Sequence, residues 1–500
     1  MDTVAAPFAA ALVGDDLLVG ADHLGLRHIY AVQGTGWAAI STSSMLLAQL
    51  GQASLDSSAL GSYCITGQYL GLATPFEGVA KLAPGHRWRL ADGRVTSHVD
   101  SVSTDPTTAH HWSPRAGAQL LRDLVEAHLA RHPETVLELS GGMDSRLILA
   151  AAPHVRRGGI TALTLSSPGS ADVPLAREIA SLNRLRHKVV DLSPLAELDP
   201  AEAHQRVLDS ATRHDCSGNP VTLGVLDWAE QQVEPGVRLT GQAGEMIRGL
   251  YFLEPRSSQI KPAHVDRFAR WWFTSNEAVP AACLVPHFAA QSRAALRAQL
   301  QASFGSYDLD WRSARDQFLL RERVHRWSGI NYSDACLRRT IGSPYFDTRF
   351  LRMCQDLPAQ AKSSSRFAAR MLEVLDPELA NMPLASGLRP VDFPRPLAEY
   401  TFSKVVTSIT RKLVQRVRPV SRAPIGADAL AEQVVKHWRA HPDVLAPAAI
   451  SGVVREEWLA GLLTGAHTAG PATVGLLANL LAIGEAKVAT GLSDAGVMGR

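Results

Sequence analysis

The chain has 500 residues, of which 46% are hydrophobic and 20% charged, and its formal net charge is +2. A chain of this length is too long for one core, so we expect two or three domains. The small net charge offers no general basic field for nucleic acid, no apolar run is long enough to span a bilayer, and the N-terminus lacks a signal-peptide pattern. We therefore expect a cytoplasmic protein without a nucleic-acid or membrane partner. The five scattered cysteines form no C-x-x-C pair and indicate neither a disulfide framework nor a zinc site.

The first hundred residues predict an antiparallel β domain. Apolar residues alternate with small or polar ones at 8–19 and 26–40, with breaks at glycine-containing turns, and a hairpin is predicted to turn at Ala91-Asp92-Gly93. A linker rich in Ser, Thr and Pro follows at 101–114, before a helical pattern at 116–131. The spacing by itself indicates no function for this domain.

The stretch from Val136 to Ala150 predicts a strand, a Gly-Gly loop and a helix. Such a loop exposes backbone N–H groups next to the positive end of a helix dipole, which suits an anion. The hydroxyls of Ser140 and Ser145 can donate to phosphate oxygens, whereas Asp144 needs a cation between itself and a phosphate. The pattern therefore indicates a nucleotide site with Mg²⁺, and the plainer alternative is an ordinary turn before a helix.

Further strands predicted at 159–167 and 187–192, separated by a helix at 172–183, indicate an α/β fold with a parallel sheet. Ligands of such sheets bind at the carboxyl ends of the strands. The strand end beside the Gly-Gly loop would lie near an adenosine, although it is equally compatible with an ordinary strand end. The predicted ATP-binding residues are Leu139, Ser140, Gly141, Gly142, Asp144, Ser145, Leu165, Ser166 and Gly241.

A second apolar run with a glycine-rich loop occupies residues 237–249. Alone it is a weak signal, typical of a strand-to-helix turn. In a doubly wound sheet it would place Glu245 opposite Asp144 across a pyrophosphate, which gives Mg²⁺ two carboxylate ligands.

The Ser-Gly-Gly-x-Asp-Ser segment resembles the pyrophosphate loop of enzymes that cut ATP between the α and β phosphates, and differs from the Gly-x-x-x-x-Gly-Lys-Ser/Thr loop. Residues 7–12, 20–30 and 74–90 resemble the second half of the glutamine-hydrolysing domain of class B asparagine synthetases. That domain uses an N-terminal cysteine, whereas this chain starts Met1-Asp2 and its first cysteine is Cys64. The resemblance implies a truncated, inactive glutaminase-like domain at 1–100, so that the nitrogen comes from another amine.

The 237–249 loop resembles the second metal-binding loop of asparagine synthetases, with Glu245 in the position of their Asp. Gln242 stands where asparagine synthetases have Glu and β-lactam synthetases have a Tyr assigned to the base, and a carboxamide is not a useful proton acceptor. These enzymes also use a downstream lysine to stabilise charge, and here Arg389 is the nearest cation, with Lys362 as the other candidate. The resemblance thus implies Glu245, Arg389 and Gln242 as catalytic residues and Asp144 with Glu245 as metal ligands.

With the helical tail at 458–492, these features are most similar to lasso-peptide cyclases, the macrolactam synthetases of ribosomal peptide (RiPP) pathways within the asparagine synthetase and β-lactam synthetase superfamily. This resemblance implies a doubly wound, parallel-sheet ATP-pyrophosphatase (adenine nucleotide α hydrolase-like) synthetase domain at 115–500. Its nucleotide-binding core would span 115–255, and a mainly helical substrate-side region would span 256–500.

The implied reaction is an AMP-forming ligation. ATP and Mg²⁺ would adenylate an Asp or Glu side chain of a ribosomally made precursor peptide, and the N-terminal amine of the peptide would form the isopeptide bond. A leader-peptide protease and a leader-recognition protein are the further partners that the resemblance suggests.

Four other functions remain open. A β-lactam or carbapenam synthetase is disfavoured by Gln242, and an ammonia-dependent, asparagine synthetase-like amide ligase by the missing half of the glutaminase domain. A tRNA-modifying enzyme would show a cysteine pair or a basic RNA face, and a non-catalytic scaffold would have no need for Asp144. A basic run at 404–422 is typical of a solvated helix face, with a peptide-binding rim as the alternative.

Overall fold

The computed structural model describes residues 6–99, 112–166, 170, 172–234, 236–249, 257–275, 278–393, 426–446 and 452–489. Most of the linker predicted at 101–114 and the whole basic run at 404–422 lie outside these residues.

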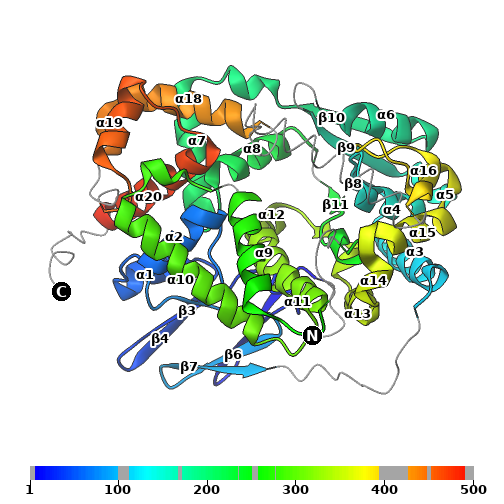
Figure 1. The fold of residues 1–500 in the computed structure, drawn as a ribbon, viewed down its shortest axis with the longest axis horizontal. Helices are drawn as coiled ribbons and strands as arrows, with labels where there is room; N and C mark the ends of the chain where they lie inside the picture. Colours follow the sequence, from blue (N-terminus) through cyan, green and yellow to red (C-terminus); the bar gives the residue numbers. More distant parts are fainter. Residues whose placement is uncertain are drawn as a thin grey trace.

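Two antiparallel sheets and two helices make up residues 6–99 (Figure 1). One sheet has the order β1-β2-β6-β7 and the other β4-β3-β5. The bounds are β1 Ala9–Val13, β2 Leu17–Ala21, β3 Tyr30–Gly34, β4 Trp37–Ser41, α1 Ser44–Gly51, α2 Ser57–Thr66, β5 Ala80–Lys81, β6 His86–Ala91 and β7 Arg94–Val99. The predicted hairpin is confirmed, because Ala91 pairs with Arg94 across Asp92 and Gly93, whose φ angles of 48° and 68° are those that a two-residue hairpin turn favours.

The second region is built on a five-stranded parallel sheet of order β10-β9-β8-β11-β12, which confirms the predicted mixed α/β fold. Its strands are β8 Thr135–Glu138, β9 Ile160–Ser166, β10 Arg186–Asp191, β11 Val237–Leu239 and β12 Ile341–Gly342. The chain moves outward from β8 to β10 and then returns to the other side of β8 to form β11. The strand order therefore reverses between β8 and β11, and ligands of doubly wound sheets bind in the crevice at such a switch point.

Helices cover both faces of this sheet because successive strand residues point to opposite faces. On one face, Leu137 and Ile160 join a core with α3 Pro114–Arg131, α4 Met143–Ala151, α6 Asp172–Leu182 and α15 Arg366–Leu375. On the other, Leu163 and Val190 join a core with α7 Pro200–Arg213, α8 Pro220–Gln231, α18 Ala427–Ala440 and α20 Pro471–Ala489. The predicted helical tail is thus two helices, α19 Glu456–Thr464 and α20.

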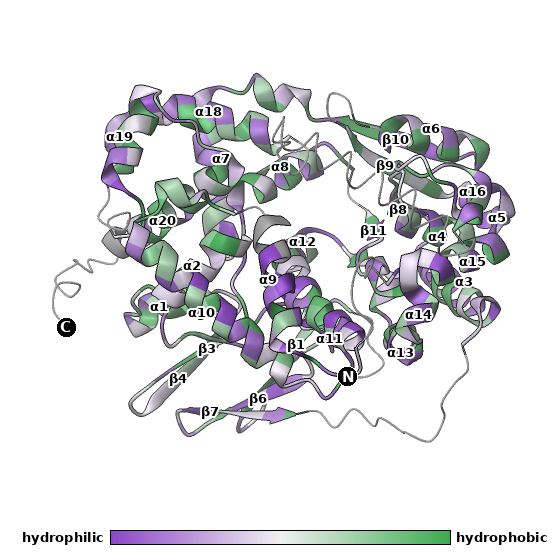
Figure 2. Cartoon of the chain, viewed as in Figure 1, coloured by the Kyte–Doolittle hydropathy of each residue, from purple (hydrophilic) through white to green (hydrophobic). Residues whose placement is uncertain are grey.

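Hydropathy follows this layering: hydrophobic residues prevail along the buried α20, whereas β6 carries mostly hydrophilic ones (Figure 2). Within the part of the chain that the structure describes, no helix combines the length and the apolarity needed to cross a membrane.

The remaining helices lie mainly between 262 and 393. The longer ones are α9 Pro262–Ser275, α10 Pro286–Gly305, α11 Trp311–Phe318, α12 Gly329–Arg338 and α13 Thr348–Asp356. A π-helical segment, η4 Leu319–Ser328, joins α11 to α12. The short segments are α5 His154–Arg157, η1 Ser193–Ala196, η2 Gly244–Ile247, η3 Ala281–Cys283, η5 Pro344–Phe346, α14 Ala359–Lys362, η6 Ser363–Ser365, α16 Pro377–Asn381, η7 Pro390–Asp392 and η8 Pro442–Leu445.

Buried polar contacts attach the N-terminal region to the helices of the second region. The Asp215 carboxylate, just after α7, accepts hydrogen bonds from Ser43 Oγ at 2.6 Å and from the Ser44 N–H at 2.9 Å. The His325 ring bonds to the backbone carbonyls of Leu24 and Gly25 at 3.1 and 3.0 Å. These contacts fix the N-terminal region against the end of α7 and against η4.

Candidate active site

The loop after β8 places two hydroxyls and the N-terminus of α4 together. Ser140 Oγ and Ser145 Oγ lie 3.3 Å apart, and Ser140 Oγ also accepts the Gly142 N–H at 3.2 Å. Gly142 is the N-cap of α4 and makes no side-chain capping bond, which leaves the first turn of the helix available to an anion. The Gly141 N–H donates to Asp172 Oδ1 at 2.8 Å, so a carboxylate already occupies one of the loop donors.

The loop after β11 packs directly onto the first loop, and its glycines make this possible. A Cβ on Gly244 would lie 2.7 Å from both Cβ and Cγ of Asp144, and one on Gly241 would lie 3.2 Å from the Ser145 nitrogen. Between them, Ala243 takes the left-handed conformation at φ 67°, which an L-residue adopts only at a cost in strain. The strained turn leads straight into η2, which carries Glu245.

Asp144 and Glu245 each face an arginine. Asp144 Oδ1 lies 3.3 Å from Arg248 Nε without a hydrogen bond to it, and Glu245 Oε1 lies 3.2 Å from Arg323 Nε. Burial raises the pKa of Asp144 to about 6, while Arg248 lowers it and the nearby Glu245 raises it further. Two carboxylates that line one cavity, one of them with an oxygen that lacks a hydrogen bond, are donors of the kind that a divalent cation takes.

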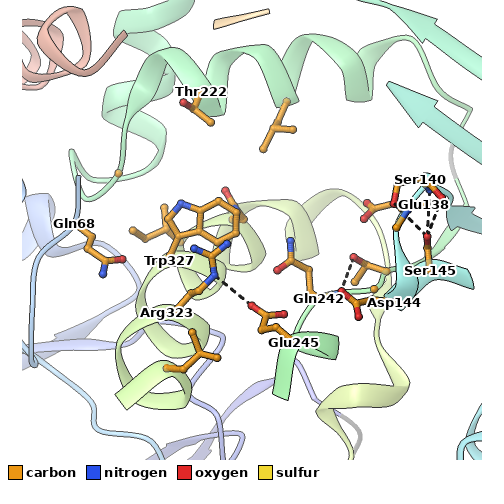
Figure 3. Close-up of a pocket in the computed structure, with 18 of the residues that line it drawn as sticks. Gln68, Glu138, Ser140, Asp144, Ser145, Thr222, Gln242, Glu245, Arg323 and Trp327 are labelled. Carbon is orange, nitrogen blue, oxygen red and sulfur yellow. Dashed lines mark hydrogen bonds and ion pairs between the residues drawn. The ribbon is translucent and has the colours of Figure 1, made fainter. Parts of the chain in front are cut away.

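A single cavity of about 1020 Å³ joins these loops to the N-terminal region (Figure 3). Most of the predicted site residues line it: Leu139, Ser140, Gly142, Asp144, Ser145, Leu165, Gly241, Gln242 and Glu245. Gly141 and Ser166 do not line the cavity. The N–H of Gly141 donates to Asp172, and the carbonyl of Ser166 accepts the Leu192 N–H at 2.9 Å.

Both cations predicted to replace the lysine of the related synthetases lie outside the cavity lining. Arg389 is half exposed and makes two hydrogen bonds to Asp392, at 3.0 and 3.2 Å. Lys362 is buried with its ammonium bound to Asp316 Oδ2 at 2.5 Å and to the Cys354 carbonyl at 2.6 Å. From the stretch that carries Arg389, the backbone of Ala385 reaches the phosphate loop, where its N–H donates to the Gly141 carbonyl at 3.0 Å.

The structure instead places Arg248, Arg315 and Arg323 at the cavity. Sequence reasoning passed over all three, although Arg248 follows Glu245 by only three residues. Glu138 was missed as well. It ends an apolar strand just before the phosphate loop, and a charged residue at such a place indicates a functional role. Burial raises the pKa of Glu138, while the neighbouring Arg238 guanidinium and a hydrogen bond from Thr240 lower it.

Gln242 is held in the cavity by its neighbours. Its side-chain Oε1 accepts a hydrogen bond from Ser328 Oγ at 3.3 Å, and its backbone carbonyl accepts one from Ser343 Oγ at 3.0 Å. A carboxamide so placed can orient a ligand and cannot take up its proton.

Comparison with known protein families gives a match that covers both loops. The family model described as asparagine synthase matches residues 116–375, which is more than half of the chain and includes both loops. The chain belongs to the asparagine synthase family. Members of this family are ATP-dependent ligases, so the predicted superfamily, the use of ATP and the ligase class are confirmed at that level. A search of curated proteins gives no match.

Proposed function

We propose that this asparagine synthase family member is an ATP-dependent macrolactam synthetase of the lasso-peptide type. It adenylates an Asp or Glu side chain of a ribosomally made peptide, and the N-terminal amine of the same peptide then forms the isopeptide bond. The observation that carries the proposal is the size and reach of the cavity, about 1020 Å³ from the phosphate loop to the N-terminal region. Sites for drug-sized ligands span roughly 300–1,000 Å³, so this one offers room for a substrate beside the nucleotide.

The nucleotide end of the cavity is supplied by the two loops. Ser140, Ser145 and the N–H groups at the start of α4 bind the pyrophosphate, and Leu139 and Leu165 flank the adenosine. Asp144 and Glu245 would hold Mg²⁺, which supplies charge neutralisation for the phosphates when it is bound. Arg248 and Arg323, which lie beside these two carboxylates, would be the cations nearest to the bound phosphates.

The bond changes follow from this placement. A side-chain carboxylate oxygen attacks the α phosphorus of ATP, the bond from that phosphorus to the bridging oxygen breaks, and pyrophosphate leaves. The amine lone pair then attacks the acyl carbon, and the C–O bond to AMP breaks. The ammonium group loses a proton that Gln242 cannot accept, and we assign this proton to Glu138, whose carboxylate lines the same cavity. Holding both ends of one peptide gives the amine a high effective concentration, so that ring closure outruns hydrolysis.

In this proposal the N-terminal region is a glutaminase-like scaffold, and its one cysteine among the described residues is Cys64. Cys64 lies fully buried inside α2, and burial raises the pKa of its thiol well above the usual range. A buried, protonated thiol is a poor nucleophile. In the proposal the amine comes from the peptide, which is the feature that separates a macrolactam synthetase from a glutamine-dependent amide ligase. A leader-peptide protease and a leader-recognition protein are the proposed partners that would deliver such a peptide.

Pyrophosphate release tests the proposal. The chain is incubated with ATP, Mg²⁺ and a panel of synthetic peptides that carry a free N-terminus and one internal Asp or Glu at varied distance. We expect peptide-dependent pyrophosphate release together with a product that has lost one water. The same peptides acetylated at the N-terminus should lose the cyclic product. Pyrophosphate release with free aspartate and ammonia, but with none of the peptides, would contradict this proposal and indicate a small-molecule amide ligase.

A further inference from the structure

Charged side chains in the part of the cavity remote from the phosphate loop already have partners. Asp316 binds the Lys362 ammonium, and Glu322 forms an ion pair with Arg326 on the same helix. A charged ligand would therefore find the carboxylates of this part of the cavity already in ion pairs.

Neutral polar groups in the same cavity are, by contrast, without partners. Thr222 is 8% exposed, and its Oγ1 has no hydrogen bond. Asn331 Oδ1 is likewise buried without one. Gln68 is 7% exposed, and its side-chain amide makes no hydrogen bond to any described residue. Buried polar atoms of folded proteins are nearly always satisfied, so the two buried atoms Thr222 Oγ1 and Asn331 Oδ1 in one cavity lining point to a ligand that completes them, and the Gln68 amide lines the same cavity.

Gln68 is held rigidly on its backbone. Gly67 ends α2 in the left-handed conformation, and the Gln68 carbonyl then accepts hydrogen bonds from Ser62 Oγ at 3.1 Å and from Thr66 Oγ1 at 3.0 Å. In Figure 3 the side chain points toward Trp327 from the side of the cavity opposite to Ser140 and Asp144. The amide is therefore aimed into the cavity at the end farther from the phosphates.

Three parts of the chain are fastened together around this end. The Gly71 N–H donates to Glu322 Oε2 at 3.3 Å, and Arg326 bonds back to the Gly71 carbonyl, which ties the N-terminal segment to η4. Tyr63 Oη donates to the Gly218 carbonyl at 3.1 Å, just before the helix that carries Thr222. The wall is thus preorganised, as a binding site requires.

We propose that the cavity holds a subsite for the peptide backbone of the substrate, formed by the Gln68 amide at the end farther from the phosphates together with the Thr222 hydroxyl and the Asn331 carbonyl oxygen in the cavity lining. The inference rests on the proposed ligase and names its substrate class. A peptide group is neutral and offers one donor and one acceptor, which a carboxamide and a hydroxyl match. A free amino acid would instead bring an ammonium and a carboxylate, whereas the carboxylates of Asp316 and Glu322 at this end are already in ion pairs. The N-terminal region then contributes a substrate-binding residue to the synthetase.

The test uses the full chain with the near-isosteric variants Gln68→Met and Thr222→Val, and with Gln119→Met on the exposed face of α3 as the matched control. For the peptide panel, the KM in pyrophosphate release and the Kd without ATP are measured. Each cavity variant should raise both constants for the peptide by roughly three- to tenfold, the effect of one neutral hydrogen bond. The KM for ATP should stay within about twofold, and the control should change neither constant.

Thermal stability separates binding from a structural role. Because these groups have no partner in the free chain, replacing them by apolar groups of the same shape should leave Tm unchanged or raise it. A lower Tm with an unchanged peptide Kd would overturn the subsite, and so would a wild-type chain that binds none of the peptides. If peptides bind through these residues but release no pyrophosphate, the ligase proposal fails and the subsite stands. If peptides drive pyrophosphate release and both variants leave the KM and Kd for the peptide unchanged, the subsite fails and the ligase proposal stands.

Discussion

Asp144→Asn should make the ligand-free protein more stable while it removes activity. In the folded chain, burial raises the pKa of Asp144 from 3.8 to about 6. One pKa unit corresponds to about 1.36 kcal/mol, so keeping this carboxylate ionised costs about 3 kcal/mol of folding free energy at neutral pH. The side chain is only 20% exposed, which leaves little solvent screening to reduce that cost.

The sign of the pH dependence follows from the raised pKa. Below pH 3.8 the carboxyl group is protonated in both the folded and the unfolded chain and the cost is absent; it grows as pH rises toward 6 and is complete above that value. The Tm of Asp144→Asn, measured by differential scanning fluorimetry, should therefore exceed that of the wild type by several degrees at pH 8, with a difference that shrinks toward pH 4. Asp209→Asn, at an exposed position of α7, is the matched control.

The opposite result would refute this reasoning. If Asp144→Asn lowers Tm at pH 8, the pair with Arg248 is a structural ion pair and the carboxylate is not held ready for a cation. Tm should also be measured with Mg²⁺, because a cation that binds only the folded chain raises its Tm. That rise should appear in the wild type and be lost in the variant.

Three more substitutions test the placement of charge and space around the cavity. Arg323→Gln should lower kcat/KM roughly ten- to a hundredfold through lost electrostatic stabilisation, whereas Arg389→Gln, at an exposed site outside the cavity, should retain near wild-type activity in the same pyrophosphate assay. Gly244→Ala should abolish release because its Cβ would lie 2.7 Å from the Asp144 side chain, and Gly305→Ala, where nothing lies within 4 Å, should be silent. Lys362→Met should lower the unfolding free energy by about 3–5 kcal/mol by breaking the largely buried ion pair with Asp316, seen as a fall in Tm with the KM for ATP unchanged.

The sequence was most informative where local chemistry and periodicity act together. The segment around Ser140 predicts its strand, loop and helix because glycine, hydroxyl and acid each have one local role there, and the 3.6-residue period predicts α3 and α6. The two-residue strand β12 was missed, since a strand so short has no period to read. It forms because Ile341 pairs with Arg238 of β11, a partner about a hundred residues away.

The cations were misplaced for a similar reason. Arg389 is the nearest cation along the chain to the place of the expected lysine, but its side chain is bound by Asp392, three residues on. Arg323 reaches Glu245 only because the π-helical η4 passes beside the second loop, and no pattern in the sequence reports that contact. The role of Gln68 could not be predicted from the sequence either, because it depends on how the N-terminal region packs against η4.

The most direct test of the account follows an oxygen atom. A peptide whose Asp or Glu side chain carries a heavy oxygen isotope in its carboxylate is turned over with ATP and Mg²⁺, and the nucleotide product is analysed by mass spectrometry. Attack of that carboxylate on the α phosphorus predicts AMP that carries one labelled oxygen, together with a peptide that has lost one water. Label in inorganic phosphate with ADP as the nucleotide product, or unlabelled AMP beside an unchanged peptide, would contradict the proposed adenylation.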